Sequence, residues 1–300
     1  MDFEMHLEDN IFCLYDQLQN GTYAHSPYKH FVIFDNKKRD IYKAEVRDRV
    51  VHQVVYDHLL SVYKPIFISD SYASRKYKGQ HRAVKTFRYF VKLASSSGGR
   101  CFVLKCDVKK YFDNIDQDIL LKLIENEICS RTELFEIIRK IIFSYNFSYP
   151  GKGIPLGNVT SQIFANIYLN TLDQYVKNEL KCRFYVRYND DMVVVSGNME
   201  ELYDVRDKII RFVRDKLLLE IPIAKTTIRK IGWGVDFLGY NILPRVALLR
   251  DKTKHKIYSN IDEKNIHSYM SILKHCSSYN LKNKLLSRIS DKNMDFVISD

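Results

Sequence analysis

The sequence predicts an α+β fold whose central part is a split βαβ arrangement. Residues 101–107 and the two runs on either side of Asn189 are rich in β-formers, whereas the chain between them repeats apolar residues at helical spacing. A helical stretch at 199–217 then leads to short strands at 228–240. This order predicts an antiparallel sheet that carries helices on one face and leaves the other face open for acidic side chains.

The first element with a clear pattern is a basic helix at residues 80–94. Its apolar side chains recur at helical spacing, and most of its Lys and Arg residues fall outside that stripe. We expect one face to pack and the other to meet phosphate groups, although a solvated basic face explains the pattern equally well. Residues 95–99, Ser-Ser-Ser-Gly-Gly, break the pattern and predict the clearest linker in the chain.

The elements after this linker follow one another closely. In chain order we expect a strand at 101–107, a helix at 116–128, a helical stretch at 132–144, a Pro/Gly loop at 150–157, a helix at 159–180, a hairpin at 184–195 and the helix at 199–217. Asp113 is expected in a turn and Asp116 at a helix N-cap. Residues 241–300 carry eleven Lys or Arg against six acids and are mostly helical in pattern from Asp262, which predicts a small basic lobe.

The composition excludes several classes of protein. A chain of 300 residues with 46% hydrophobic residues can bury a sizeable core, so a disordered class is excluded. The six cysteines form no close CxxC pair and are expected to be reduced packing residues. No apolar stretch approaches the length of a membrane span, and Asp2, Glu4 and Glu8 stand where a signal peptide carries Lys or Arg. We therefore expect a cytoplasmic protein.

The charge distribution indicates a polyanionic partner. The formal net charge is +11, and residues 72–110 contain eleven Lys or Arg against one acid. This window alone accounts for most of the excess, which a local phosphate-binding surface explains better than general solubility does.

The most informative short motif is Tyr188-Asn189-Asp190-Asp191, at the tip of the predicted hairpin. Adjacent acids on a tight turn repel each other unless a cation joins them, although a solvated turn is the alternative interpretation. The run Val193 to Val195 suits a buried strand, and Asp107 ends another such strand. Two metal ions about 4 Å apart, held by carboxylates of neighbouring strands, are the usual clamp for displacement at phosphorus. Phosphoryl or nucleotidyl transfer is therefore the leading chemistry.

Several ordered motifs resemble those of prokaryotic reverse transcriptases, from about Arg39 to the C-terminal end. They are the first catalytic segment at 107–115, the Gly-Ile-Pro-Leu-Gly-Asn-Val-Thr-Ser-Gln segment at 153–162, the Tyr188–Asp191 turn, Lys225, and the primer-grip hairpin Phe-Leu-Gly-Tyr at 237–240. Within the family, the segments 47–52, 71–79, 157–162 and 268–276 are most similar to the reverse transcriptases of diversity-generating retroelements. Related defence-associated reverse transcriptases share much of this pattern.

This resemblance implies a right-hand polymerase with fingers, a split-βαβ palm and a short helical thumb. The fingers are expected at 1–98, completed by roughly 130–160, the palm at 99–243 and the thumb at 244–300. The implied activity is RNA-directed DNA synthesis from deoxynucleoside triphosphates with two Mg²⁺ ions, or Mn²⁺ as an alternative. The implied partners are an RNA template, a DNA or RNA primer, and a noncoding RNA or a basic accessory protein.

The resemblance also assigns catalytic and metal-binding roles. Asp107 and Asp190 are expected to bridge both ions, Asp191 to assist, and the main-chain carbonyl of Val108 to supply another ligand. Lys225 is expected to donate a proton to the leaving pyrophosphate, and neutralising phosphate charge is an equally good explanation for it.

Five further residues are assigned to the nucleotide. Phe112 is expected to exclude a 2′-hydroxyl by bulk, with core packing as its alternative, and Gln162 to contact template or nucleotide, with a buried capping amide as its alternative. Arg75 and Lys78, with Lys76 as a further candidate, are expected to hold the triphosphate. Leu156 stands where most retroviral and intron enzymes carry Gln. Trp233 and Tyr240 are expected to pack in the primer-grip region, with stacking on a base as the alternative.

Two biological settings remain open at this point. The apolar Leu156 removes a hydrogen-bond donor that would check nucleotide geometry, which favours low fidelity and a mutagenic retroelement. An antiviral reverse transcriptase that works from a bound noncoding RNA is the alternative enzyme. A catalytically silent RNA-binding scaffold is the alternative from a different class.

Overall fold

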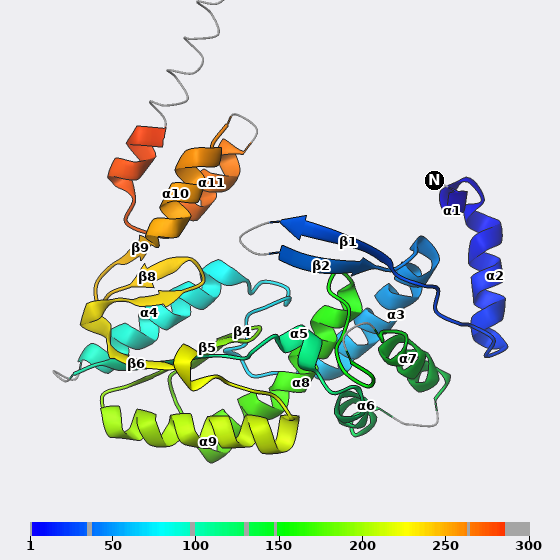
Figure 1. The fold of residues 1–300 in the computed structure, drawn as a ribbon, viewed down its shortest axis with the longest axis horizontal. Helices are drawn as coiled ribbons and strands as arrows, with labels where there is room; N and C mark the ends of the chain where they lie inside the picture. Colours follow the sequence, from blue (N-terminus) through cyan, green and yellow to red (C-terminus); the bar gives the residue numbers. More distant parts are fainter. Residues whose placement is uncertain are drawn as a thin grey trace, which may run out of the picture.

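The computed structural model describes residues 2–34, 38–96, 100–128, 132–146, 149–262 and 265–285. Within these ranges the predicted α+β fold is confirmed, with helices around three separate antiparallel sheets. The helices α2 (Leu7–Gln19) and α10 (Asp251–Asn260) lie on opposite sides of the molecule, and the four-stranded sheet lies below α10 in this view (Figure 1).

The helices and strands have the following bounds. The other helices are α1 (Asp2–Met5), α3 (Val46–Tyr63), α4 (Gln80–Ser96), α5 (Tyr111–Asn114), α6 (Gln117–Glu125), α7 (Glu133–Phe143), α8 (Val159–Gln174), α9 (Met199–Leu217) and α11 (Ile266–Leu273). The strands are β1 (Lys29–Phe34), β2 (Lys38–Lys43), β3 (Phe102–Asp107), β4 (Tyr185–Tyr188), β5 (Asp191–Ser196), β6 (Thr227–Lys230), β7 (Val235–Phe237), β8 (Tyr240–Ile242) and β9 (Ala247–Leu249). The sheets are β1-β2, β4-β5-β3-β6 and β7-β8-β9.

The predicted elements are found with shifted ends. The helix expected at 159–180 is α8 followed by a π-helical turn, Tyr175–Glu179. Helix α4 continues to Ser96, so the expected linker is wrong at residues 95 and 96, while residues 97–99 lie outside the described residues. Residues 228–240 do not stay in one sheet, because β6 pairs with β3 whereas β7 begins the separate three-stranded sheet. Asp116 caps α6 as expected, accepting a hydrogen bond from the Ile119 amide.

The four-stranded sheet is covered on both faces, which corrects the expectation of an open face. In β3, Val103 joins the apolar cluster formed with α4 and the small sheet, whereas Leu104 and Cys106 join the cluster formed with α8 and α9. This alternation is the two-residue period of a strand. Figure 1 shows α4 and α9 on opposite sides of the sheet. Asp107 and Asp191, at one end of the sheet, are half-buried rather than fully covered.

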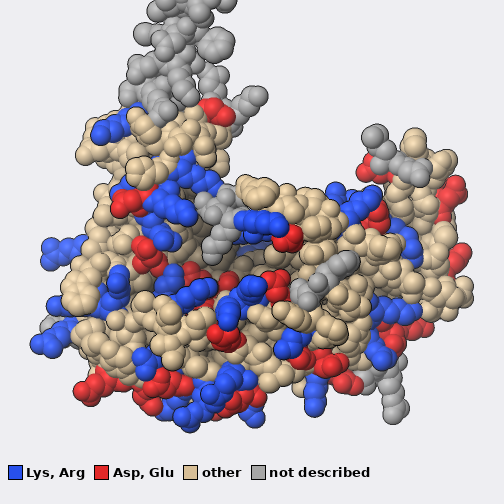
Figure 2. Space-filling model, viewed as in Figure 1, with Lys and Arg blue, Asp and Glu red and all other residues tan. Residues whose placement is uncertain are grey.

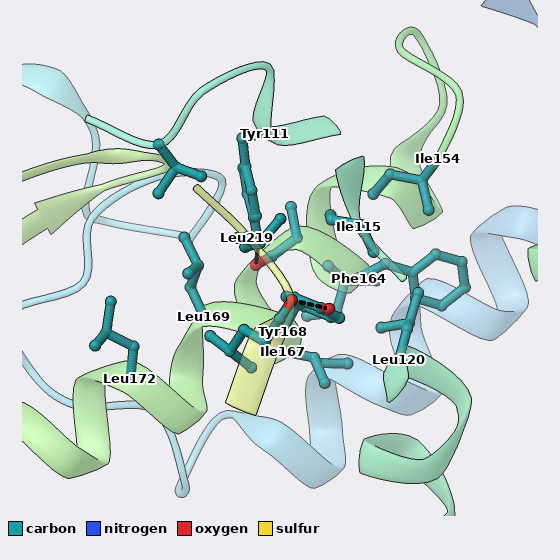
Figure 3. Packing of buried hydrophobic residues seen from close by; sticks show 14 of the residues in the cluster. Tyr111, Ile115, Leu120, Ile154, Phe164, Ile167, Tyr168, Leu169, Leu172 and Leu219 are labelled. Carbon is teal, nitrogen blue, oxygen red and sulfur yellow. Dashed lines mark hydrogen bonds between the residues drawn. The ribbon is translucent and has the colours of Figure 1, made fainter. Parts of the chain in front are cut away.

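The larger apolar core lies between the sheet and α8. Tyr111 of α5 points down to α8, where its hydroxyl donates to the Ala165 carbonyl at 2.5 Å (Figure 3). Tyr168 of α8 is fully buried and donates to the Leu217 carbonyl at 2.7 Å. Burying each large apolar side chain contributes about 1.5–3 kcal/mol, so this cluster fixes α5, α8 and α9 around the sheet.

The small sheet carries the C-terminal lobe. Tyr240 is fully buried, and its hydroxyl donates to the Ile272 carbonyl at 3.1 Å, as expected for a packing residue. The same expectation is wrong for Trp233, which is 74% exposed. Cys101, Cys106 and Cys182 are buried free thiols, in agreement with the expected packing role, whereas Cys13 is exposed. In the described part of the chain, no helix is both long and apolar enough to cross a membrane.

Candidate active site

The three predicted metal ligands converge at one end of the four-stranded sheet. Asp107, the last residue of β3, is the cross-strand partner of Asp191, the first residue of β5. Directly opposed residues in antiparallel strands have Cβ atoms about 5 Å apart. Asp190 precedes Asp191 in the turn between β4 and β5, so all three carboxylates belong to one cluster.

The acidic turn, Tyr188–Asp191, has a backbone that suits its sequence. Tyr188 pairs with Asp191, which leaves Asn189 and Asp190 as a two-residue connection. Asn189 has φ of 52°, in the left-handed region that Asn tolerates better than most residues. An Asn between Tyr and Asp is therefore explained by the turn geometry.

A buried ion pair fixes the acidic turn relative to α8. The Arg187 side chain is fully buried and forms two hydrogen bonds to Asp173 of α8, from Nε at 2.7 Å and Nη2 at 2.6 Å. Its Nη1 donates to the Asn189 carbonyl at 3.1 Å. Tyr185 donates to the same Asp173 carboxylate at 2.8 Å. The guanidinium thus ties the turn to α8, and burial of both charges is compensated by paired hydrogen bonds.

Two lysines face the acidic cluster. Lys105 Nζ lies 3.2 Å from the Asp191 carboxylate and hydrogen-bonds to its Oδ2, and Lys225 Nζ lies 3.4 Å from Asp107 Oδ2. Burial still raises the pKa of Asp191 to about 6, although Lys105 lowers it. Burial raises the pKa of Asp190 as well, and the Asp107 charge raises it further. These raised pKa values mean that the folded protein disfavours full ionisation of the cluster, even with two lysines beside it.

The donor set fits a hard divalent cation. Asp191 Oδ1 is buried and accepts no hydrogen bond in the described structure, although Lys105 Nζ lies 3.2 Å from it as an ion-pair partner, and Asp107 and Asp190 repel each other. Carboxylate oxygens are the ligands that Mg²⁺ prefers. Among the described residues, no three His, Cys, Asp or Glu side chains already stand in a coordination shell. Lys225 and Lys105 occupy part of the space around the carboxylates.

A pocket of about 470 Å³ opens beside the acidic turn. This turn pocket is lined by the cations Lys38 and Arg39, by Phe112 and Leu156, and by Asn189 and Asp190. Leu156 is fixed there because its carbonyl accepts from the Tyr42 amide of β2 at 2.9 Å. Figure 2 shows acidic and basic side chains gathered around the central hollow of the molecule. The pocket combines cations, an apolar floor and acids, which is a suitable lining for a nucleotide.

The other predicted nucleotide ligands do not line this pocket. Arg75 Nη1 donates to the Ile68 and Ser71 carbonyls at 2.6 and 2.9 Å, and Lys78 Nζ donates to the Ser69 carbonyl at 2.6 Å. Both cations therefore shape their own loop in this structure. Gln162 is exposed on α8, so the alternative of a buried capping amide is wrong for it. Val108 follows Asp107 with a buried side chain.

Sequence reasoning missed four residues of the site. Lys38 and Arg39 begin β2 and reach the turn pocket, and their signal was a basic pair in front of a β-forming run. Lys105 shares a strand face with Asp107, a relation that two-residue spacing predicts. Arg187 is a charged residue within an otherwise apolar strand, which is weak evidence for a buried ion pair. Its partner Asp173 lies in a mostly buried helix.

Comparison with known proteins identifies the family. Residues 31–242, more than half of the chain, match the family described as reverse transcriptase (RNA-dependent DNA polymerase). The chain belongs to the reverse transcriptase family. The match confirms the prediction of a reverse transcriptase at the level of the whole family, and the acidic cluster lies inside the matched range.

Individual relatives of this reverse transcriptase chain are distant. It is 25% identical to the group II intron-encoded protein LtrA of Lactococcus lactis subsp. cremoris over 79% of this chain and 50% of that protein. It is 24% identical to protein YkfC of Escherichia coli K12 over 77% of this chain and 70% of that protein. The chain thus spans half the length of the intron-encoded relative.

Solved structures share the fold. Apo telomerase from Candida tropicalis matches with a TM-score of 0.57 and 15% identity over 77% of this chain and 49% of that one. Telomerase from Candida albicans matches with a TM-score of 0.56 and 14% identity over 76% of this chain and 48% of that one. At this identity the likeness concerns the fold alone, and it supports the reverse transcriptase architecture.

Proposed function

We propose that this chain is an RNA-directed DNA polymerase that makes cDNA by nucleotidyl transfer. The observation that supports it most is the opposition of Asp107 and Asp191 on paired strands, with Asp190 in the adjoining turn and the turn pocket beside it. In this proposal residues 1–98, with about 130–160, form the fingers, 99–243 the palm and 244–300 the thumb. The setting is the cytoplasm.

The reaction joins the primer 3′-oxygen to the α-phosphorus of a deoxynucleoside triphosphate while the bond to pyrophosphate breaks. Two Mg²⁺ ions would supply Lewis-acid activation of the primer hydroxyl and neutralise the charge that develops on phosphate oxygens. Asp107, Asp190 and Asp191, with the Val108 carbonyl, would hold these ions. Lys225 would give a proton to the departing pyrophosphate, and its contact with the Asp107 carboxylate supports a position close to the reacting phosphates.

Lys38 and Arg39 supply positive charge to the turn pocket, where a triphosphate would lie beside the acids. Phe112 and Leu156 bound the same pocket with apolar surface. Arg187 holds the Asn189 carbonyl and so fixes the direction of the acidic turn. Each of these groups binds or orients, and nucleotidyl transfer depends mainly on such positioning.

A primer-extension assay tests the proposed activity. The purified chain is given an RNA template with an annealed DNA primer, deoxynucleoside triphosphates and Mg²⁺. We expect extension that chelation of Mg²⁺ abolishes. RNA binding without extension under these conditions would support the silent scaffold instead.

The Phe112→Ala substitution should relax sugar discrimination. Phe112 lines the turn pocket next to Asp190, and removing its ring leaves space for a 2′-hydroxyl. We expect the ratio of kcat/KM for deoxynucleotides over ribonucleotides to fall by tenfold or more, since a lost steric contact of about 1.4 kcal/mol gives that factor. Phe12→Ala, an exposed phenylalanine on α2 that lines neither the turn pocket nor any other part of the proposed site, is the matched control. An unchanged ratio would refute the assignment.

The Leu156→Gln substitution should raise fidelity. An amide at this place restores a donor facing the turn pocket, and one such hydrogen bond is worth about 1–2 kcal/mol. We expect steady-state misincorporation to fall by roughly tenfold, as a donor that checks base-pair geometry penalises mismatches. Leu156→Met, which keeps the volume without a donor, is the control. If Leu156→Gln leaves misincorporation unchanged, the proposal that Leu156 lowers fidelity is contradicted.

The biological setting proposed is a diversity-generating retroelement with a noncoding RNA, a basic accessory protein, or both. The apolar Leu156 in the turn pocket, which offers no hydrogen-bond donor to check nucleotide geometry, supports this setting. Neighbouring genes provide the test, because a variable target gene with an imperfect repeat is expected beside a retroelement. A defence cluster at that place would favour the antiviral alternative.

A further inference from the structure

A second cationic groove lies between α4 and the turn that connects β8 to β9. It has a volume of about 730 Å³ and is lined by Lys85, Arg88, Tyr89 and Lys92 from α4 and by Arg245 from the turn. No acidic residue appears in its described lining. We call these five residues and the space between them the basic groove. None of the five lines the turn pocket.

The helical part of this groove is one stripe. Lys85, Arg88, Tyr89 and Lys92 have the spacing i, i+3, i+4, i+7 that places side chains on one helix face, over about 10 Å of helix. All four are exposed, while Phe87 and Val91 are buried on the opposite face. Like charges at this spacing destabilise a helix, so the stripe favours an anion that neutralises it.

An exposed aromatic ring stands within the stripe. Tyr89 is 56% exposed, and the lysines and arginine lie on either side of it along the helix. Cations that track a phosphate backbone, combined with an aromatic ring on which a base stacks, are the usual features of sites for single-stranded nucleic acid. Cations alone are sufficient to bind small anions, so the exposed ring favours a nucleic acid over a small anion.

The groove lies away from the acidic turn. Phe90 of α4 packs against Phe184, with ring centroids 5.2 Å apart. Phe184 lies four residues before Tyr188 in the sequence. Four residues of extended strand span about 13 Å, so the middle of α4 lies roughly that far along β4 from the turn. The basic groove is therefore separate from the acidic turn, where the primer terminus would lie.

We propose that the basic groove binds a single-stranded segment of RNA outside the turn pocket. Lys85, Arg88 and Arg245 contact phosphates and Tyr89 stacks on a base. The choice of RNA over other polyanions rests on the proposed function. The groove would retain the RNA on the enzyme while another part of it, or another molecule, is copied.

The double substitution Lys85→Ala/Arg88→Ala tests the groove. A labelled single-stranded RNA of about 30 nucleotides is titrated in the presence of excess short RNA–DNA duplex, which occupies the acidic end. Losing two phosphate contacts should make the slope of log K against log salt shallower by about 1.4, and weaken binding about 10- to 25-fold near 0.1 M salt. Tyr89→Ala should weaken binding about fivefold or more and leave the slope unchanged.

The control is Arg211→Ala/Lys216→Ala, which removes two exposed cations from α9 on the opposite side of the sheet. An equal loss of affinity in this control would overturn the site, since net charge alone would then explain binding. Extension of the short duplex should stay within about twofold in the Lys85/Arg88 variant. If extension falls as much as RNA binding does, the groove belongs to the catalytic cleft and the proposal fails.

These readouts separate this proposal from the polymerase assignment. RNA binding is measured without catalysis, so a chain that binds RNA through the groove but extends no primer would refute only the proposed function. Alanine at exposed helix positions favours the helix, and thermal unfolding of each variant confirms that the fold is retained.

Discussion

Asp190→Asn should abolish primer extension and at the same time stabilise the metal-free protein at pH 8. The substitution removes a carboxylate proposed to hold both divalent ions, whose stabilisation of several kcal/mol corresponds to a loss of more than about a hundredfold in rate. It also removes a charge that the folded state disfavours, because burial and the neighbouring Asp107 raise the pKa of Asp190. We expect a gain of about 1–3 kcal/mol in the free energy of unfolding.

The pH dependence follows from the same shift. A carboxyl whose folded-state pKa is raised binds protons more tightly in the folded state, so its contribution to stability is present at low pH and is lost as pH rises. For Asp191 the loss runs from its ordinary pKa near 4 to about 6, and for Asp190 it runs in the same direction. The free energy of unfolding of the wild type without Mg²⁺, measured with urea, should therefore fall as pH rises through this window. The fall should be smaller for Asp190→Asn, because one of the two carboxyls with a raised pKa is absent.

Mg²⁺ supplies an independent readout. An ion that binds the folded state alone raises the melting temperature, and we expect this rise for wild type at pH 8 but little of it for Asp190→Asn. Asp118→Asn, an exposed acid in the first turn of α6, is the matched control and should change neither extension nor the Mg²⁺ response. If Asp190→Asn keeps wild-type extension, the acidic turn is not the catalytic centre.

Arg187→Met should have the largest effect on stability. It leaves the fully buried Asp173 without its cation, and breaking a buried ion pair from one side costs about 3–5 kcal/mol. The Asn189 carbonyl also loses its donor, so extension should fall in whatever fraction of the protein folds. Chemical unfolding measures the first effect, and kcat per folded molecule measures the second.

A paired substitution separates the two roles of Arg187. Arg187→Met/Asp173→Leu removes both charges together and should recover much of the stability, because an apolar pair of similar size can replace a buried ion pair. The hydrogen bond to the turn stays absent, so activity should remain low. Arg183→Met, at an exposed arginine just before β4, should change stability by less than about 0.5 kcal/mol. A loss of under about 1 kcal/mol for Arg187→Met would contradict the structural role given to the ion pair.

The spacing of residues within single segments was sufficient to predict most of the helices and strands. The β-forming runs of β3 and β5, the helical stripe of α4 and the helix α9 were predicted because each depends on near neighbours in sequence. The ends of α4 and α8 were not, since α4 runs two residues beyond its expected end at residue 94, whereas the α-helical part of α8 stops at Gln174 and gives way to a π-helical turn. The exposure of Trp233 was also missed, because its surroundings come from elements distant in the chain.

The candidate site divides in the same way. The sequence by itself determined that Asp107, Asp190 and Asp191 lie at strand ends and in a tight turn, because a strand and a turn are local structures. Only the tertiary structure decided that Asp107 stands opposite Asp191, that Lys38 and Arg39 rather than Arg75 and Lys78 line the turn pocket, and that Arg187 is buried against Asp173. Those relations depend on strand register and on which loops approach one another, and neither is encoded in the spacing of residues within one segment.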